Sequence, residues 1–127
     1  MNFYWKKGLI WINVDLDYNG NKYHIENCIV DTGSASTAID IELVDFDYGR
    51  PTQIKRLSGI GGTQEVVSQK VESLGFGDIE INNLNIEFGN LQSNYDINGF
   101  IGTDVLSRFH VSIDFLNKEI SFINMII

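Results

Sequence analysis

Apolar and polar residues alternate along most of this chain, with the period of two that is typical of half-buried β-strands. Residues 9–18 (LIWINVDLDY) alternate in this way, residues 19–22 (NGNK) offer a hairpin turn, and residues 23–30 (YHIENCIV) resume the alternation. The N-terminal part of the chain is therefore predicted to form a long β-hairpin.

The middle of the chain carries two further hairpin signals. Residues 52–72 form two predicted strands that meet at a glycine-rich tip, residues 59–62 (GIGG). Residues 73–90 suggest two shorter strands joined through the Asn-Asn pair at 82–83, because asparagine tolerates the backbone of a tight turn. Both segments are predicted to add strands to the same sheet as the first hairpin.

The C-terminal part combines strand and helix signals. Residues 111–127 contain a strand, a turn at 117–118 and a final strand. Residues 103–109 (TDVLSRF) have helical spacing of their apolar positions, with Thr103 as the expected N-cap. Residues 37–48 are compatible with either a strand or a short helix. These patterns predict a mostly-β fold with one short helix.

Length and charge narrow the classes of function. A chain of 127 residues is long enough for one hydrophobic core but not for two, which predicts a single domain over residues 1–127. The net charge of −8 argues against a nucleic-acid partner, because phosphate binding needs a basic surface. The apolar runs are too short to span a bilayer and no secretory signal precedes them, so a soluble cytoplasmic protein without a membrane partner is expected.

Few side chains have the spacing of a metal site. Cys28 is the only cysteine, so no disulfide or cysteine-based cluster is expected, and it is interpreted as a small core residue. His24 and His110 lack metal-ligand spacing and are expected to be surface or packing residues. The acidic cluster at 40–49 is expected to be a solvated face. No metal and no organic cofactor are predicted.

The segment 28–37 (CIVDTGSAST) raises the central question, because an apolar strand ends in a carboxylate followed only by small side chains. Three interpretations of Asp31-Thr32-Gly33 compete. The simplest is a tight turn in which Asp31 accepts backbone N–H bonds. The second is an aspartyl-phosphate nucleophile, which would need a magnesium site and a phosphate-binding lysine that have no recognisable motif here.

The third interpretation is a pair of carboxylates that share one proton and activate a water molecule. One carboxylate acts as general base toward the water, and the other acts as general acid toward a carbonyl oxygen. Such a site needs a rigid loop in which backbone N–H groups reach the carboxylate, and glycine permits that close approach. Residues 31–34 (DTGS) supply an acid, a hydroxyl, a glycine and a second hydroxyl in this order.

At this point the chain resembles the retropepsin type of aspartic protease, a single closed lobe as in retroviral proteases. The resemblance rests on three motifs in the family's order: residues 31–34 (DTGS), the glycine-rich tip 59–62, and residues 100–106 (FIGTDVL). The closing segment 111–123 resembles the strand pair that ends many bacterial members. The match extends from about residue 8 to the C-terminus.

The resemblance implies a function as an aspartic endopeptidase (hydrolase) that cleaves peptide or protein substrates. The chain has one Asp-Thr-Gly, so two carboxylates require a homodimer with Asp31 from each subunit at the twofold axis. The alternative is a non-catalytic peptide-binding or dimerisation module of the same fold. The implied roles are catalysis for Asp31, support of the active-site loop for Thr32, Gly33 and Ser34, a substrate-binding flap for Gly59, Ile60, Gly61 and Gly62, and a structural role behind the site for Ile101 and Gly102.

Overall fold

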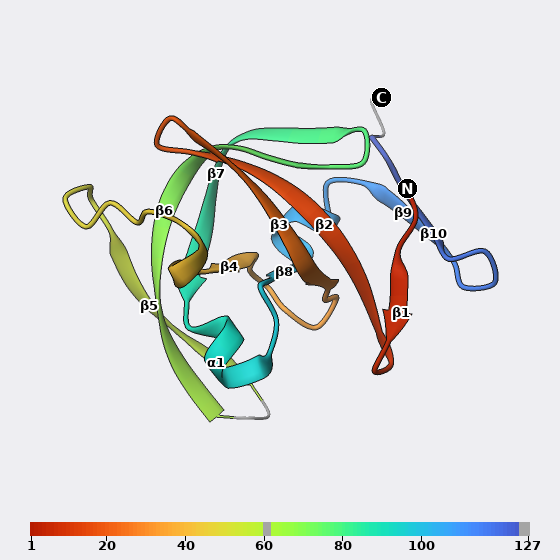
Figure 1. Ribbon diagram of the computed structural model, residues 1–127, viewed down its shortest axis with the longest axis horizontal. Coiled ribbons are helices and arrows are strands. Elements are labelled where there is room, and N and C mark those ends of the chain that lie inside the picture. The colour runs from red at the N-terminus through yellow and green to blue at the C-terminus, as the bar shows by residue number, and fades with distance from the viewer. Residues whose placement is uncertain (60–61, 125–127) are drawn as a thin grey trace.

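The computed structural model describes residues 1–59 and 62–124 and is built almost entirely of strands (Figure 1). Its strands are β1 (Tyr4–Lys6), β2 (Leu9–Tyr18), β3 (Asn21–Val30), β4 (Ala38–Asp40), β5 (Gln53–Gly59), β6 (Gly62–Phe76), β7 (Ile79–Gly89), β8 (Gly99–Ile101), β9 (His110–Asp114) and β10 (Glu119–Ile123). Its helical elements are the 3₁₀ turn η1 (Ile41–Leu43) and the helices α1 (Leu91–Tyr95) and α2 (Thr103–Leu106).

Eight of the described strands form one sheet that closes on itself. Their order is β1-β2-β3-β8-β4-β7-β6-β5, and β2 also pairs with β6. This β2–β6 pairing aligns Leu16 with Leu74. It closes the strands that lie between β2 and β6 in the sheet order into a ring. Closure removes the free edges of those strands. The mostly-β, closed fold that the sequence predicts is confirmed.

Two predicted hairpins are confirmed. β2 and β3 are joined at Asn19 and Gly20, whose φ angles of 53° and 82° suit a tight two-residue turn. β5 and β6 pair antiparallel up to Gly59 and Gly62, while Ile60 and the following glycine lie outside the described residues.

The hairpin predicted at the Asn-Asn pair is wrong. β6 runs on to Phe76, the chain turns at Gly77 with a φ of 57°, and β7 then continues through Asn82 and Asn83 without a break. Asn83 has a φ of 55°, a value that asparagine tolerates better than most residues. The asparagine therefore marks a local irregularity within β7, and not a turn. The glycine at 77 satisfies the steric need of a turn better than the asparagines do.

The prediction of one short helix is incomplete. α2 spans Thr103 to Leu106 and is shorter than predicted. The prediction of Thr103 as N-cap is wrong, because Thr103 is the first helical residue and Gly102 is the N-cap. α1, between β7 and β8, was not predicted, because five residues are too few for a helical period to appear. The ambiguous segment 37–48 contains both structures, since β4 is followed directly by η1.

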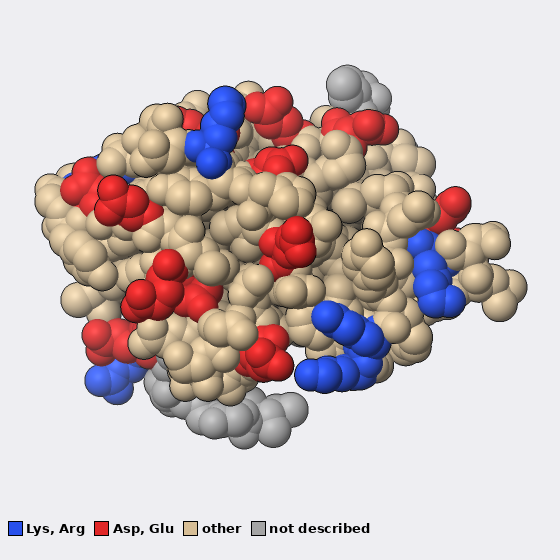
Figure 2. Space-filling model, in the orientation of Figure 1, with Lys and Arg blue, Asp and Glu red and all other residues tan. Residues whose placement is uncertain are grey.

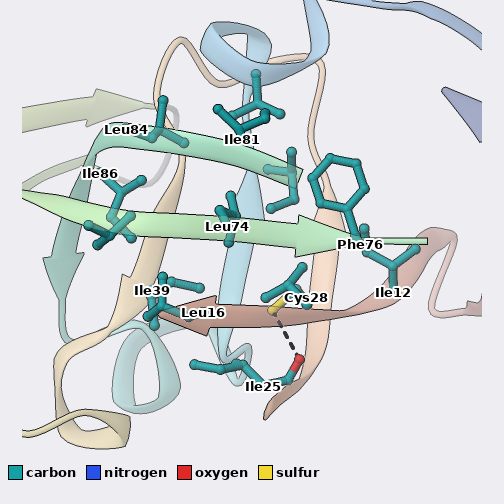
Figure 3. Close-up of a cluster of buried hydrophobic side chains, with 14 of the residues drawn as sticks. Ile12, Leu16, Ile25, Cys28, Ile39, Leu74, Phe76, Ile81, Leu84 and Ile86 are labelled. Atoms are coloured by element: carbon teal, nitrogen blue, oxygen red, sulfur yellow. Dashed lines mark hydrogen bonds between the residues drawn. The ribbon is translucent and has the colours of Figure 1, made fainter. Parts of the chain in front are cut away.

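The main hydrophobic core fills the interior of the closed sheet (Figure 3). Cys28 lies within it with its side chain fully buried, and burial raises the pKa of its thiol to about 12, which agrees with the core role expected for it. A second, smaller cluster packs on the other side of β4 and β8. It consists of Trp11, Ala38, Leu91, Ile97 and Phe100.

The acidic cluster at 40–49 is only partly the solvated face that was expected. Asp40 is 2% exposed, and its carboxylate accepts hydrogen bonds from the backbone N–H groups of Glu42 (3.2 Å) and Gln92 (3.1 Å). Phe46, in the same cluster, is buried in the main core. Asp40 therefore ties η1 to α1, a role that charge patterning alone does not reveal.

The two ends of the chain pair with each other. The N-terminal ammonium of Met1 donates to the carbonyl of Ile120 (2.9 Å), and the N–H of Ile120 donates back to Met1 (2.9 Å). β9 and β10 form the predicted C-terminal hairpin, whose turn is stabilised by Asp114. Hydrogen bonds from the Asn117 side chain and backbone lower the pKa of Asp114.

Charged side chains are scattered over the face shown in Figure 2, and no continuous basic surface appears on it. Among the described residues, no helix has the length and hydrophobicity needed to cross a membrane.

Candidate active site

Asp31 is the first residue after β3, and its backbone is fixed by a neighbouring strand. β3 pairs in parallel with β8, which places Val30 opposite Ile101. The N–H of Asp31 then donates to the carbonyl of Ile101 (2.9 Å). The carboxylate therefore leaves the sheet at a position that the β3–β8 pairing sets.

The loop after Asp31 folds back on its carboxylate. The N–H of Gly33 donates to Asp31 Oδ1 (2.9 Å), and the N–H of Ser34 donates to the Asp31 carbonyl (3.2 Å). Asp31 is half-buried, while Thr32 and Gly33 are exposed. These bonds orient an accessible carboxylate, and they also satisfy the tight-turn interpretation of the same residues.

Gly102 is the point at which two backbones cross behind this loop. A Cβ at this position would lie 2.3 Å from the Ser36 carbonyl oxygen and 2.8 Å from that of Ser34. The N–H and hydroxyl of Thr103 both donate to the Ser34 carbonyl, at 2.8 and 3.2 Å. Any side chain at residue 102 would push the loop away, so the glycine is required by packing rather than by its φ angle.

Two further residues lock the loop, and sequence reasoning missed both. Asp104 accepts hydrogen bonds from the Thr37 hydroxyl (2.7 Å) and the Thr37 backbone N–H (3.1 Å). The Thr37 hydroxyl in turn accepts a bond from the N–H of Gly102 (3.0 Å). The only sequence signal for this role of Asp104 was its place in the first turn of α2. An acid at that place is equally explained by a favourable interaction with the helix dipole.

The Ser34 side chain stabilises the loop itself. Its hydroxyl donates to the Ser36 carbonyl (2.8 Å) and accepts from the Ser36 N–H (3.3 Å). The described hydrogen bonds of Ser34 Oγ therefore lie within the loop and do not reach the Asp31 carboxylate.

Comparison with known proteins identifies this arrangement. A family model described as "Aspartyl protease" matches residues 14–105, which include the loop, the crossing at Gly102 and most of the sheet. The chain belongs to the aspartyl protease family. The sequence suggested the retropepsin type within this family. A solved structure supports this: the chain is similar to a retropepsin-like aspartic protease from Rickettsia conorii. The TM-score is 0.62 at 23% identity, with 89% of this chain and 90% of that chain covered. No curated protein matches the sequence.

The family and fold remove the aspartyl-phosphate interpretation of Asp31. That chemistry is typical of a parallel, doubly wound sheet, whereas most strand pairs of this chain are antiparallel. The described residues contain no cluster of three or more His, Cys, Asp or Glu side chains that could hold a metal ion.

The β5–β6 hairpin is the segment to which the resemblance assigns a flap. Gly59 and Gly62 are its last described residues and pair with each other. Ile60 and Gly61, the predicted tip, lie outside the described residues. The flap assignment therefore stays a prediction for all four residues of the tip.

The two histidines lie on the surface. His24 Nδ1 is 2.8 Å from Asp15 Oδ1 in an exposed pair, and this hydrogen bond raises the pKa of His24. His110 is exposed at the start of β9. Both positions agree with the surface role expected from the sequence.

A buried carboxylate on β7 is the third residue that sequence reasoning missed. The Glu87 side chain is 5% exposed, and its only ion pair among the described residues is with Lys55 of β5, at 3.8 Å. Burial raises the pKa of Glu87, while the Ser36 hydroxyl and the Lys55 ammonium act in the opposite direction. Its place between Ile86 and Phe88 predicts a side chain facing away from the core, but gives no sign that this face is covered.

Proposed function

We propose that this chain is an aspartic endopeptidase that hydrolyses peptide bonds with Asp31 from two subunits. The observation that carries the proposal is the accessible Asp31 carboxylate, held by the Gly33 N–H on a loop that is locked through Gly102. In a member of the aspartyl protease family, a carboxylate at this point of this fold is a candidate catalytic acid.

The second carboxylate must come from another copy. The sequence contains one Asp-Thr-Gly, and the proposed reaction needs one group to accept a proton while another donates one. A symmetric homodimer meets this need, because a twofold axis beside Asp31 places two identical loops face to face. Exposed aromatic side chains near the termini, Trp5 and Phe115, provide apolar surface outside the core.

In the proposed reaction the two carboxylates hold one proton between them, because two negative charges at close range repel. The ionised Asp31 removes a proton from a water molecule as the water attacks the peptide carbonyl. The protonated Asp31 donates to the carbonyl oxygen, so a tetrahedral intermediate forms without a free oxyanion. Thr32 and Gly33 stiffen the loops that hold the pair.

The flap hairpin, β5 and β6, would close over an extended peptide. Glycines at 59, 61 and 62 would permit bending and close backbone contact. With no charged residue in the Asp31 loop besides Asp31 itself, we expect apolar substrate side chains on both sides of the cut.

The proposal is tested by incubating the purified chain with a diverse peptide library, with and without a transition-state-mimicking aspartic protease inhibitor. Cleavage that the inhibitor blocks, and that Asp31→Asn abolishes, is the expected result. Peptide binding without cleavage would instead identify a non-catalytic module. Cleavage that survives Asp31→Asn would contradict the proposed role of this residue.

A further inference from the structure

We propose that Glu87 is a specificity-determining residue: it forms an acidic subsite that binds a lysine or arginine side chain of the substrate. This inference rests on the proposed function and concerns the same cleft, at a position set back from the Asp31 loop. Three observations support the inference: the position of the Glu87 side chain on β7, its carboxylate oxygen without a hydrogen-bond donor, and the excess of negative over positive charge around it.

Strand register places Glu87 on the face of the sheet opposite the main core. Its neighbours Ile86 and Phe88 both pack in that core, so the alternation of β7 turns Glu87 the other way. Ser68 of β6 and Ala38 of β4 are its cross-strand partners. Ala38 belongs to the second apolar cluster, so Glu87 borders an apolar surface.

Glu87 is also joined to the proposed catalytic loop. Its backbone N–H donates to the Thr37 carbonyl (3.0 Å), and Thr37 ends the loop that begins at Asp31. Lys55, its ion-pair partner, lies on the first strand of the proposed flap. A peptide held between flap and loop would therefore pass the Glu87 carboxylate.

One oxygen of the Glu87 carboxylate is unsatisfied. Oε2 is buried and accepts no hydrogen bond within the described residues, although the Ser36 hydroxyl and the Lys55 ammonium lie close enough to lower the pKa of the group. Glu87 Oε1 is 3.8 Å from Lys55 Nζ, which is longer than a hydrogen bond. A buried carboxylate oxygen without a donor is costly, so its retention calls for a ligand that supplies one.

The surrounding charge favours a cationic ligand. Asp104 lies close enough to act on Glu87 electrostatically, and its carboxylate is held by neutral donors of Thr37 and Val105. Arg108 binds the Asp104 backbone carbonyl and not its carboxylate. Two acids thus face one ammonium, that of Lys55, and an additional positive charge would balance them.

Lys55 occupies in the free chain the place that we assign to a substrate side chain. Its side chain is 47% exposed, so it can turn outward into water at small cost when a peptide binds. The incoming ammonium or guanidinium would then donate to Glu87 Oε2 at hydrogen-bond distance, which Lys55 does not reach.

The test compares paired peptides that differ by one charge. A sequence cleaved by the wild-type chain is resynthesised with lysine, or with its neutral analogue norleucine, at each position around the cut. We expect kcat/KM to favour lysine by roughly tenfold or more at one position, as for a charge-assisted hydrogen bond. Glu87→Gln should abolish this preference, so that the ratio of kcat/KM for the lysine peptide to kcat/KM for the norleucine peptide falls to about one. Glu72→Gln, an exposed substitution on the same pair of strands, should retain it.

Lys55→Met provides a second measurement that does not depend on Glu87→Gln being folded. Removing the competing ammonium should lower KM for the lysine peptide more than for the norleucine peptide. The subsite is overturned if the wild-type chain cleaves peptides without preferring lysine anywhere, or if Glu87→Gln keeps the preference. If no peptide is cleaved at all, the proposed function fails, and the affinities of lysine and norleucine versions of a library peptide that the chain binds are compared instead: a preference that requires Glu87 upholds the subsite, and its absence overturns it.

Discussion

At the scale of single residues, the Asp31 loop is held by close backbone contacts more than by side-chain chemistry. The Ser34 and Ser36 carbonyls both face Gly102, at distances that leave no room for a methyl group. The resemblance implied a structural role behind the site for Gly102, and this crossing is the physical form of that role. The sequence could not predict the Thr37–Asp104 hydrogen bonds beside it, because residues 67 apart in sequence show no local pattern that links them.

The first prediction concerns this crossing. In Gly102→Ala the added methyl group would collide with backbone atoms that cannot move independently, so the free energy of unfolding should fall by about 3 kcal/mol or more. Urea denaturation measures this change. Gly49→Ala is the matched control, because its added methyl group meets only the flexible Asp47 side chain, at 3.2 Å. Equal stability of the two variants would contradict the close crossing.

The second prediction concerns pH and Glu87, which faces Lys55 of β5 and Asp104 of α2. Because the folded-state pKa of Glu87 is raised, the folded chain holds this proton more tightly than the unfolded chain does. The stability that this proton contributes is present at acidic pH and is lost as pH rises through the raised pKa. The free energy of unfolding of Glu87→Gln, relative to that of the wild type, should therefore be higher at pH 7 than at pH 4. Denaturation curves whose difference does not change with pH would contradict the raised pKa.

At the scale of elements, the period of two predicted the strands well and the turns less well. The hairpins at Asn19 and at residues 117–118 carried unambiguous turn residues, whereas Asn82 and Asn83 competed with a better turn at Gly77. The helix α1 escaped prediction because it is too short for periodicity. The closing β2–β6 pairing is a contact between distant strands, which no local pattern encodes.

The third prediction concerns the β5–β6 hairpin. If it is a flap, Gly62→Val should lower kcat/KM by roughly tenfold or more, because the branched side chain opposes the bending and close approach to substrate. Thermal unfolding should change little, since Gly62 is paired at the far end of the hairpin. Gly49→Val, outside the hairpin, serves as the control for a glycine substitution. Full activity of Gly62→Val would remove the flap assignment.

At the scale of the whole molecule, the closed sheet presents one catalytic candidate. The family and the fold follow from the sequence because three separated motifs occur in one order, and the structure brings two of them, the Asp31 loop and the Gly102 segment, into contact. In the proposed mechanism the second carboxylate comes from another copy of the chain, so one copy alone would not contain a complete site of the proposed kind.

The fourth prediction tests this central claim through mixed dimers. Asp31→Asn protein is added in increasing amounts to a fixed concentration of wild-type chain, under conditions in which sedimentation shows a dimer, and peptide cleavage is measured. Because a mixed dimer has one carboxylate, cleavage should fall steadily and approach zero when the mutant is in large excess. If cleavage stays constant at every ratio while the two chains exchange subunits, Asp31 does not act as half of a shared pair.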